Sequence, residues 1–241
     1  MIKRNYYKIV RIFPDPSSYF YIKNETMNQN YMDFNSSWLG TVNLEYSFDK
    51  VNWTRFNGVN IPADSYMYLR NTSGTFCISE YTQVLYPNEN ISLGGDIRTL
   101  FNYTDVESVT KIPDYGFSRI FSMQNGAKIT DISNLSFRGI TEIGNYGLKF
   151  TFAWFHTGTK GVDLRDVTTL GEGALQNLYY DNYNLKEVYA PNVSTWDVNK
   201  TTQWLDNVAS TGVVYKPSTL TIPNGNSGIP YGWTTQDYPV K

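Results

Sequence analysis

The pattern of apolar positions repeats three times between Tyr115 and Trp196. Each copy opens with Gly or Ala, carries two apolar anchors four residues apart, and closes on a run whose first, third and sixth positions are apolar or Thr. The anchors are Phe117 and Phe121, Leu148 and Phe152, and Leu175 and Tyr179. The closing runs are Thr130, Ile132 and Leu135; Val162, Leu164 and Val167; and Val188, Ala190 and Val193.

A repeated unit whose inner spacing holds while the linking segments vary predicts a solenoid. The second anchor precedes the middle residue of the closing run by 11, 12 and 11 positions (121 to 132, 152 to 164, 179 to 190). Anchors four residues apart share one face of a helix, and an alternating run favours a short strand. One helical turn or 3₁₀ segment followed by one strand per copy, with the strands parallel across copies, is the plan of a leucine-rich repeat. An irregular β domain without true repeats is the alternative.

Apolar and polar residues alternate with a period of two before the repeats begin. Leu44, Tyr46 and Phe48 alternate with polar residues, Asp49-Lys50 makes a turn, and the alternation resumes, which predicts a hairpin. Further short strands at a spacing of roughly ten residues predict a β-sandwich. The pattern stops at Gly94-Gly95, which is the best candidate for a boundary.

The two ends of the chain differ from the rest. Residues 1–20 combine cations, aromatic residues and two prolines, which favours an extended arm over a helix. Such an arm would pack on a neighbouring subunit through Tyr6, Tyr7, Ile9, Ile12 and Phe13; a disordered terminus is the alternative. Beyond residue 199 we expect a last short helix near Trp204, a final strand at 213–215, and a turn-rich cap whose core Trp204 and Trp233 close.

The predicted fold is mainly β with short helices. It consists of an anchoring arm (1–20), a β-sandwich-like module (21–94), a leucine-rich-repeat-like solenoid (95–198) and a C-terminal cap (199–241).

Composition narrows the class of protein. Only 17% of the 241 residues are charged and 20 are Tyr, which is typical of a β-rich extracellular or virion surface. A net charge of −2 argues against nucleic acid and anionic membranes as partners. The single cysteine, Cys77, excludes an intrachain disulfide and is expected to be buried. We find no signal peptide and no apolar run long enough to span a bilayer.

Candidate catalytic residues are few. His156 is the only histidine, so a His-pair metal site is excluded, and packing beside Trp154 is the better interpretation. Asp163, Asp166 and Glu172 could serve a glycosidase, but their spacing follows from the repeat, which favours solvated flanks. No phosphate-binding loop is present. We therefore predict no enzyme activity, no cofactor and no metal.

Aromatic residues near the repeat loops are the best candidates for ligand contact. Exposed Tyr and Trp rings stack on sugar rings while their polar edges stay hydrated. Because Tyr179 is an anchor, Tyr180, Tyr183 and Trp154 are the predicted glycan-contact residues. A contact between subunits would use the same residue types.

Several segments resemble one group of proteins. Tyr46-Ser47-Phe48-Asp49, Ile61-Pro62-Ala63 and Tyr68-Leu69-Arg70 resemble the N-terminal β module of leucine-rich-repeat surface proteins of Bacteroidetes and related phage proteins. The segments 204–212 (WLDNVASTG) and 228–234 (GIPYGWT) resemble the ending of the same group, which includes BspA-like repeat proteins and structural proteins of crAss-like bacteriophages. The matching segments cover most of residues 40–238, whereas residues 1–20 resemble nothing in the group.

The resemblance implies a function without catalytic residues. We expect a structural protein on the virion surface of a tailed phage, a head or tail fibre or decoration that attaches to capsid or tail proteins through its N-terminal region. By analogy it would be a homotrimer that binds a host-surface glycan. The alternative is a bacterial cell-surface adhesin or carbohydrate-binding module; the missing export signal favours the phage group. A carbohydrate-active enzyme is a third hypothesis.

Overall fold

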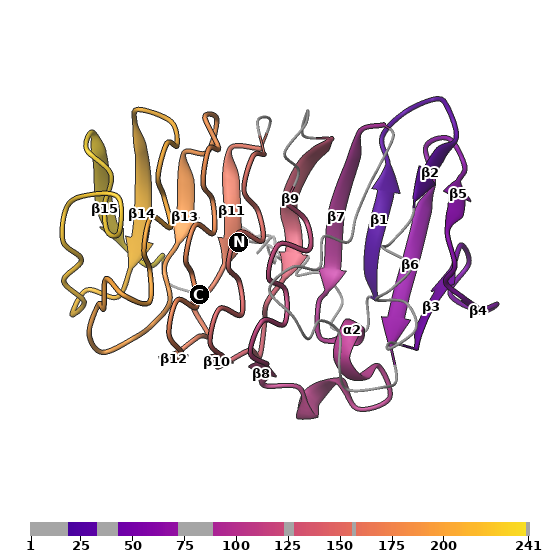
Figure 1. Cartoon of the computed structure of the whole chain (residues 1–241), viewed down its shortest axis with the longest axis horizontal. Coiled ribbons are helices and arrows are strands. Elements are labelled where there is room, and N and C mark those ends of the chain that lie inside the picture. The colour runs from indigo at the N-terminus through magenta and orange to yellow at the C-terminus, as the bar shows by residue number, and fades with distance from the viewer. Residues whose placement is uncertain (1–18, 33–42, 72–88, 123–127, 156–157, 240–241) are drawn as a thin grey trace, which may run out of the picture.

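The computed structural model describes residues 19–32, 43–71, 89–122, 128–155 and 158–239. Their strands lie side by side along the long axis of the molecule (Figure 1). The helices among these described residues are short: one α-helical turn, α2 (Thr99–Asn102), and one 3₁₀ turn, η1 (Val106–Ser108). The prediction of a mainly β fold with short helices is therefore confirmed. Cys77, His156 and the arm residues up to 18 lie outside the described residues.

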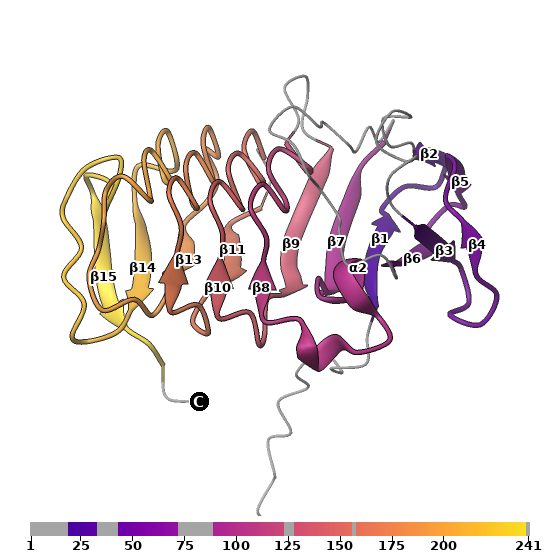
Figure 2. The same cartoon turned by 60° about the horizontal axis from the view of Figure 1, so that its bottom comes forward.

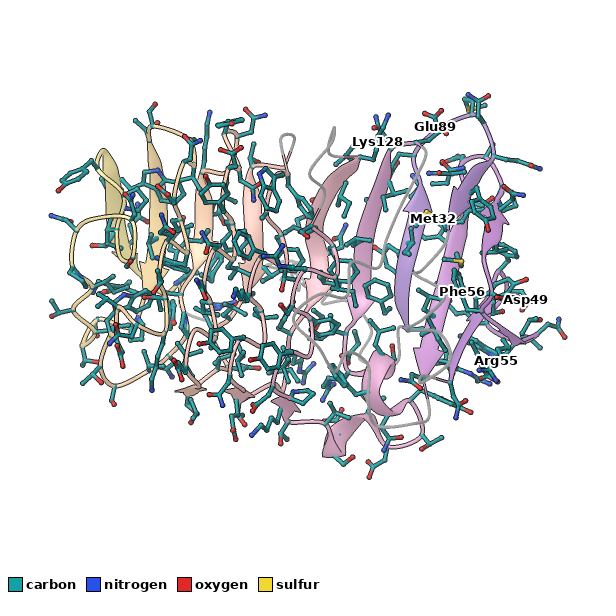
Figure 3. All side chains as sticks on the ribbon, viewed as in Figure 1. Met32, Asp49, Arg55, Phe56, Glu89 and Lys128 are labelled. Atoms are coloured by element: carbon teal, nitrogen blue, oxygen red, sulfur yellow. The ribbon has the colours of Figure 1, made fainter. Side chains whose placement is uncertain are left out.

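The strands of the N-terminal half, together with the first long strand of the second half, form a six-stranded sheet. In order across the sheet, its strands are β4 (Thr54–Arg55), β3 (Leu44–Ser47), β6 (Tyr66–Asn71), β1 (Phe20–Asn24), β7 (Ile91–Asp96) and β9 (Ile129–Ser136). A separate two-stranded ribbon joins β2 (Asn30–Met32) to β5 (Val59–Ile61). Met32 and Phe56 are buried, whereas Asp49 and Arg55 lie at the outer end of the sheet (Figure 3).

The hairpin predicted at Asp49-Lys50 is present. β3 and β4 pair antiparallel, but the connection is longer than predicted: residues 48–53 form the loop, and Lys50 within it has a left-handed φ of 63°. The Asp49 carboxylate accepts hydrogen bonds from the backbone N–H groups of Val51 and Asn52, each at 2.8 Å. These bonds hold the pKa of Asp49 well below its usual value.

Gly94 and Gly95, where the sequence pattern changes, lie inside β7. This strand pairs antiparallel with β1 on one side and parallel with β9 on the other. The hydrogen-bonded sheet therefore continues through this position into the second half of the chain.

The second half is a stack of coils (Figure 2). Each of the first three coils contains a short strand, a run of turns and a second strand, and a tight turn leads from the first coil to the second and from the second to the third. The fourth coil, residues 198–216, has a turn run and a second strand but, within the described residues, no first strand. The first strands form one parallel sheet, β8 (Lys111–Ile112), β10 (Glu142–Ile143) and β12 (Thr169–Leu170). The second strands follow β9 and form another parallel sheet, β11 (Lys160–Asp163), β13 (Glu187–Tyr189), β14 (Gly212–Lys216) and β15 (Trp233–Asp237).

The helical turn or 3₁₀ segment predicted at the anchors is wrong, because these segments form runs of turns that include residues with left-handed φ. The runs cover residues 114–121, 145–154, 172–181 and 198–207. Within a run, alternate N–H groups bond three residues back, as Gly147 does to Gly144 O at 3.1 Å. The intervening N–H groups donate to the next coil, as Leu148 does to Ala174 O at 2.9 Å. A helix would use all of these donors internally and leave none to join the coils.

The four-residue spacing of the anchors survives in this geometry. Tyr146, Phe150 and Trp154 have left-handed φ values of 54°, 53° and 65°, so the backbone of the run repeats every four residues. Residues four apart therefore point the same way, and all six predicted anchors are buried, none more than 2% exposed.

The first closing run was assigned to the wrong residues. The tight turns of successive coils are equivalent, since Ile140 N donates to Phe137 O at 3.1 Å and Val167 N to Leu164 O at 3.0 Å. The residues equivalent to Val162, Leu164 and Val167 are therefore Leu135, Phe137 and Ile140. Thr130 and Ile132 belong to the earlier part of β9, the longest strand described.

A fourth coil follows where a last helix was predicted. Leu175 N donates to Lys200 O and Tyr179 N to Trp204 O, each at 2.9 Å, which places Thr201 and Leu205 at the anchor positions. The strand predicted at 213–215 is present as β14, but β15 lies beyond it. Trp204 and Trp233 are buried as predicted, at 0% and 7% exposure.

One apolar core runs through both halves. Four stacked rings follow its long axis, with centroids about 6 Å apart: Phe20, Phe121, Phe152 and Tyr179. Phe20 belongs to β1 and the other three to successive turn runs. In the part of the chain that the structure describes, no helix has the length and apolarity needed to cross a bilayer.

Candidate functional site

Aromatic side chains from two neighbouring turn runs meet on the outer surface of the coils. Trp154 and Tyr180 have ring centroids 5.8 Å apart, and Phe150 stacks on Trp154 at 5.5 Å. Phe150 also contacts Tyr180, at 6.3 Å between centroids. All three side chains are half-buried, so each keeps some surface exposed. Phe150, Trp154 and Tyr180 are called the aromatic cluster below.

Backbone hydrogen bonds fix the positions of these rings. Trp154 N donates to Tyr180 O at 2.8 Å, which aligns the end of one run with the end of the next. Phe150 lies four residues before Trp154, at the previous left-handed position of the same run. The cluster is therefore a consequence of how the coils stack.

Arg119 extends the aromatic cluster by one coil. Its guanidinium carbon lies 4.6 Å from the Phe150 ring centroid, a cation–π distance. Phe150 therefore contacts Arg119 as well as Trp154. The buried Nε of Arg119 has no hydrogen-bond partner among the described residues.

The structure brings two of the three predicted glycan-contact residues into contact. Trp154 and Tyr180 belong to the cluster. Tyr183 lies on the same loop as Tyr180 and is 49% exposed. A hydrogen bond to Asp181 raises the pKa of the Tyr183 hydroxyl.

Phe150 and Arg119 were missed by the sequence analysis. Each stands two residues before the second anchor of its copy, as Asn177 does in the next copy. Arg119 and Phe150 are partly exposed at this position, whereas Asn177 is buried, so the position in the repeat alone did not identify them.

The three carboxylates considered for a glycosidase have structural partners. Asp163 forms an ion pair with Arg165 at 2.6 Å, and Asp166 accepts the Gly139 N–H at 3.0 Å. Glu172 accepts a hydrogen bond from the Tyr146 hydroxyl at 3.1 Å. The Asp166 and Glu172 contacts join neighbouring coils, whereas the Asp163–Arg165 pair lies within one turn. Within the described residues, no group of three His, Cys, Asp or Glu side chains could hold a metal ion.

A second aromatic surface lies on the six-stranded sheet. Tyr66 stacks on Tyr68 at 6.2 Å, and Tyr21 meets Tyr66 edge-on at 5.2 Å. Lys50 lies 4.5 Å above the Tyr68 ring. Burial raises the pKa of the Tyr21 and Tyr68 hydroxyls. Both rings are therefore partly covered, and they also contact each other edge-on, at 6.4 Å between centroids. Tyr66, at 41% exposure, offers the most open ring of the three.

Comparisons of this chain with protein-family models, with curated proteins and with solved structures gave no match.

Proposed function

We propose that this chain is a non-enzymatic structural protein of a virion surface, a fibre or decoration of a tailed phage that binds a glycan on the host. The observation that carries the proposal is the aromatic cluster, which a stack of hydrogen-bonded coils holds in place. Flat aromatic rings held on a rigid scaffold are well suited to stack on sugar rings.

We assign the stack of coils to the leucine-rich-repeat-like solenoids, and the N-terminal half to a sandwich-like module. Parallel sheets built from successive copies and a capped last coil support the first assignment. The six-stranded sheet with the β2–β5 ribbon supports the second. The sheet and the ribbon are linked by a hydrogen bond, which the Asn24 side-chain amide in β1 donates to Ile61 O in β5 at 3.2 Å.

The virion assignment rests on the resemblance of residues 40–238 to structural proteins of crAss-like phages. The N-terminal arm is proposed to join the chain to capsid or tail proteins, and the assembled fibre is proposed to be a homotrimer. Light scattering of the purified chain tests the trimer.

Glycan binding is tested by removing rings from the cluster. The double variant Trp154→Ala/Tyr180→Ala is expected to lose binding to host-surface polysaccharide, measured by biolayer interferometry. Losing two aromatic rings that stack on sugar rings should lower the affinity for the glycan by at least about tenfold. Tyr231→Ala is the control, because Tyr231 is 82% exposed and lies far along the chain in the C-terminal turns. If the parent chain, the double variant and Tyr231→Ala all bind equally well, the aromatic cluster is not the glycan-binding site.

Attachment to the particle is tested by deleting residues 1–18. The deletion ends there because Tyr19 and Phe20 already belong to the sheet. The shortened chain is expected to fold but not to join the particle. Incorporation at the normal level, measured by mass spectrometry of purified virions, would rule out the arm as the anchor.

The same surface would also serve a bacterial cell-surface adhesin, which is the second candidate. Mass spectrometry separates the two, since a virion protein purifies with particles and an adhesin with the cell envelope.

A further inference from the structure

Arg119 carries a positive charge without a carboxylate partner at the edge of the aromatic cluster. Its side chain is partly exposed, and among the described residues no Asp or Glu lies within ion-pairing distance of it. Two other arginines also lie over aromatic rings, but both are paired: Arg70 with Glu45 at 2.7 Å and Arg165 with Asp163 at 2.6 Å. The charge of Arg119, unlike theirs, is not neutralised within the described chain.

The guanidinium of Arg119 is already positioned. Its carbon lies 4.6 Å from the Phe150 ring centroid, and its Nε is buried without a hydrogen-bond partner. The backbone N–H of Arg119 donates to Lys149 O at 2.8 Å, which aligns this residue with the next coil. A cation that is ordered and partly removed from water attracts an anion more strongly than a mobile, hydrated cation does. Arg119 is therefore suited to bind an anionic group.

Charge of the opposite sign lies at the other side of the aromatic cluster. The turn runs line up along one side of the stack (Figure 2), and Arg119 belongs to the first run, whereas Asp181 belongs to the third. The Asp181 carboxylate already accepts hydrogen bonds from the side chains of Asn207 and Tyr183. An anionic group on a ligand is therefore attracted to the Arg119 side and repelled from the Asp181 side.

Two further charged groups on these runs lie together at Tyr146. The Lys149 Nζ is 5.0 Å from the Tyr146 ring centroid, and Glu172 accepts a hydrogen bond from the Tyr146 hydroxyl at 3.1 Å. Because these two charges are opposite and lie at the same residue, they largely offset each other. Arg119 therefore decides which charge the cluster prefers in a ligand.

The spacing of the coils matches a short saccharide. Hydrogen-bonded neighbours in a sheet lie about 5 Å apart, so the first and third runs are about 10 Å apart. A disaccharide can cover this distance with one ring on the aromatic cluster and an anionic substituent at Arg119. The planar guanidinium fork matches the oxygens of a carboxylate or of a tetrahedral oxyanion such as sulfate.

We infer that the glycan bound by the aromatic cluster is anionic and places a carboxylate or sulfate group against Arg119. This inference rests on the proposed function, because it names the class of glycan that the same site binds.

Saturation-transfer NMR titrations of the full chain test the inference with matched probes. Methyl glucuronide is compared with methyl glucoside, and methyl galacturonide with methyl galactoside; within a pair, only a carboxylate replaces a hydroxymethyl group. Methyl galactoside 6-sulfate distinguishes sulfate from carboxylate. At least one anionic probe is expected to bind about tenfold more tightly than its neutral partner, as for a charge-assisted hydrogen bond. Added NaCl should weaken this binding and leave the neutral probes unaffected.

Substitution of Arg119 assigns the preference to its charge. Arg119→Gln should lower the affinity for the preferred anionic probe about tenfold and leave that for its neutral partner unchanged. The retained neutral binding also shows that the variant keeps the folded site. Arg138→Gln is the matched control, because it makes the same change in net charge at an exposed arginine in the tight turn after β9. It should bind every probe as the parent chain does.

The outcomes separate this inference from the proposed function. The inference is overturned if no anionic probe binds, if the neutral partners bind equally well, or if Arg119→Gln keeps the parent's affinity for the anionic probes. Glycan binding by the aromatic cluster is judged independently, from host polysaccharide binding by Trp154→Ala/Tyr180→Ala. If that double variant loses the polysaccharide while the anionic probes show no advantage, the cluster binds a neutral glycan and only the inference fails.

Discussion

Arg98 and Arg165 form the same local ion pair in different coils, but the two pairs differ in burial and should therefore contribute differently to stability. Each arginine stands two residues after an aspartate and bonds both of its carboxylate oxygens. The tight turns that follow are equivalent, since Leu100 N donates to Ile97 O and Val167 N to Leu164 O, each at 3.0 Å. The Arg98 side chain is 2% exposed and that of Arg165 is 18% exposed.

Removing the two arginines should therefore have unequal effects. Arg98→Met leaves the Asp96 carboxylate buried and unpaired, which costs about 3–5 kcal/mol of unfolding free energy. Arg165→Met leaves Asp163 partly hydrated, so its cost should be at most about 1 kcal/mol. Urea unfolding of both variants measures the difference. Equal losses would show that burial of the pair at Arg98 has no energetic consequence.

Tyr179 should make stability depend on pH in the alkaline range. Burial, as the largest cause, raises the pKa of its hydroxyl, which accepts the Val162 N–H at 2.8 Å. In the unfolded chain a tyrosine ionises near pH ~10. The stability that Tyr179 contributes is thus complete below that pH and is lost as pH rises above it.

The variant Tyr179→Phe tests this assignment. At pH 7 it should lose about 1–3 kcal/mol, because the buried Val162 N–H loses its acceptor. Between pH 9 and 11 its unfolding free energy should fall less than that of the parent chain. Tyr231→Phe, at an exposed ring, is the control and should follow the parent at every pH. Parallel curves for parent and Tyr179→Phe would contradict the assignment.

At the scale of elements, the turn runs show which features can be predicted from the sequence alone and which cannot. The four-residue spacing correctly predicted burial of the six anchors in the three predicted copies, because both a helix and a turn run return a side chain to the same face after four residues. The spacing could not separate the two, since the choice depends on whether a donor such as the Leu148 N–H bonds within its run or to the next coil. That bond exists only once the neighbouring coil is in place.

The same limit explains the other errors at this scale. Residues 122–128 lengthen the first link, so a count from Phe121 reaches Ile132 before the true equivalent, Phe137. Thr201 stands at an anchor position where an apolar residue was expected, and the fourth copy was therefore missed. Similarly, Trp154 and Tyr180 could be predicted as site residues from their residue type. Arg119 could not, because it contacts the Phe150 ring only when neighbouring coils are aligned.

Gly173 should be required by packing as well as by its backbone. Its φ is 56°, and a Cβ there would lie 2.4 Å from the Tyr146 ring of the neighbouring coil. Gly173→Ala should cost about 2–4 kcal/mol, from the left-handed backbone and the steric clash together. In a Tyr146→Ala background the cost should fall by at least about 1 kcal/mol. A double-mutant cycle by urea unfolding measures this coupling; a coupling of zero would mean that the ring does not constrain the turn.

At the scale of the whole molecule, the two halves share one sheet and one core. β7 pairs with β1 in one half and with β9 in the other, and the ring stack passes from Phe20 to Phe121. Because neither half can open without exposing the face of the other, we predict one cooperative unfolding transition. Differential scanning calorimetry should give a van't Hoff enthalpy close to the calorimetric enthalpy. Two resolved transitions would instead support independent units that meet at Gly94-Gly95.

The C-terminal segment should be needed to close the stack. Trp204 Nε1 donates to Gly228 O and Trp196 Nε1 to Ser227 O, each at 2.8 Å, so the segment covers both indole rings. A chain that ends after Lys216 would expose these rings and leave the edge of β14 unpaired. Open edges and uncapped repeats associate, so this truncated chain should elute as aggregates in size-exclusion chromatography. The deletion of residues 1–18 is the matched control, since it leaves every described strand intact and should elute as the parent chain does. If the truncated chain stays monodisperse with an unchanged melting temperature, the last coil is stable without its cap, and Trp204 must be protected by contacts other than those with residues 217–239.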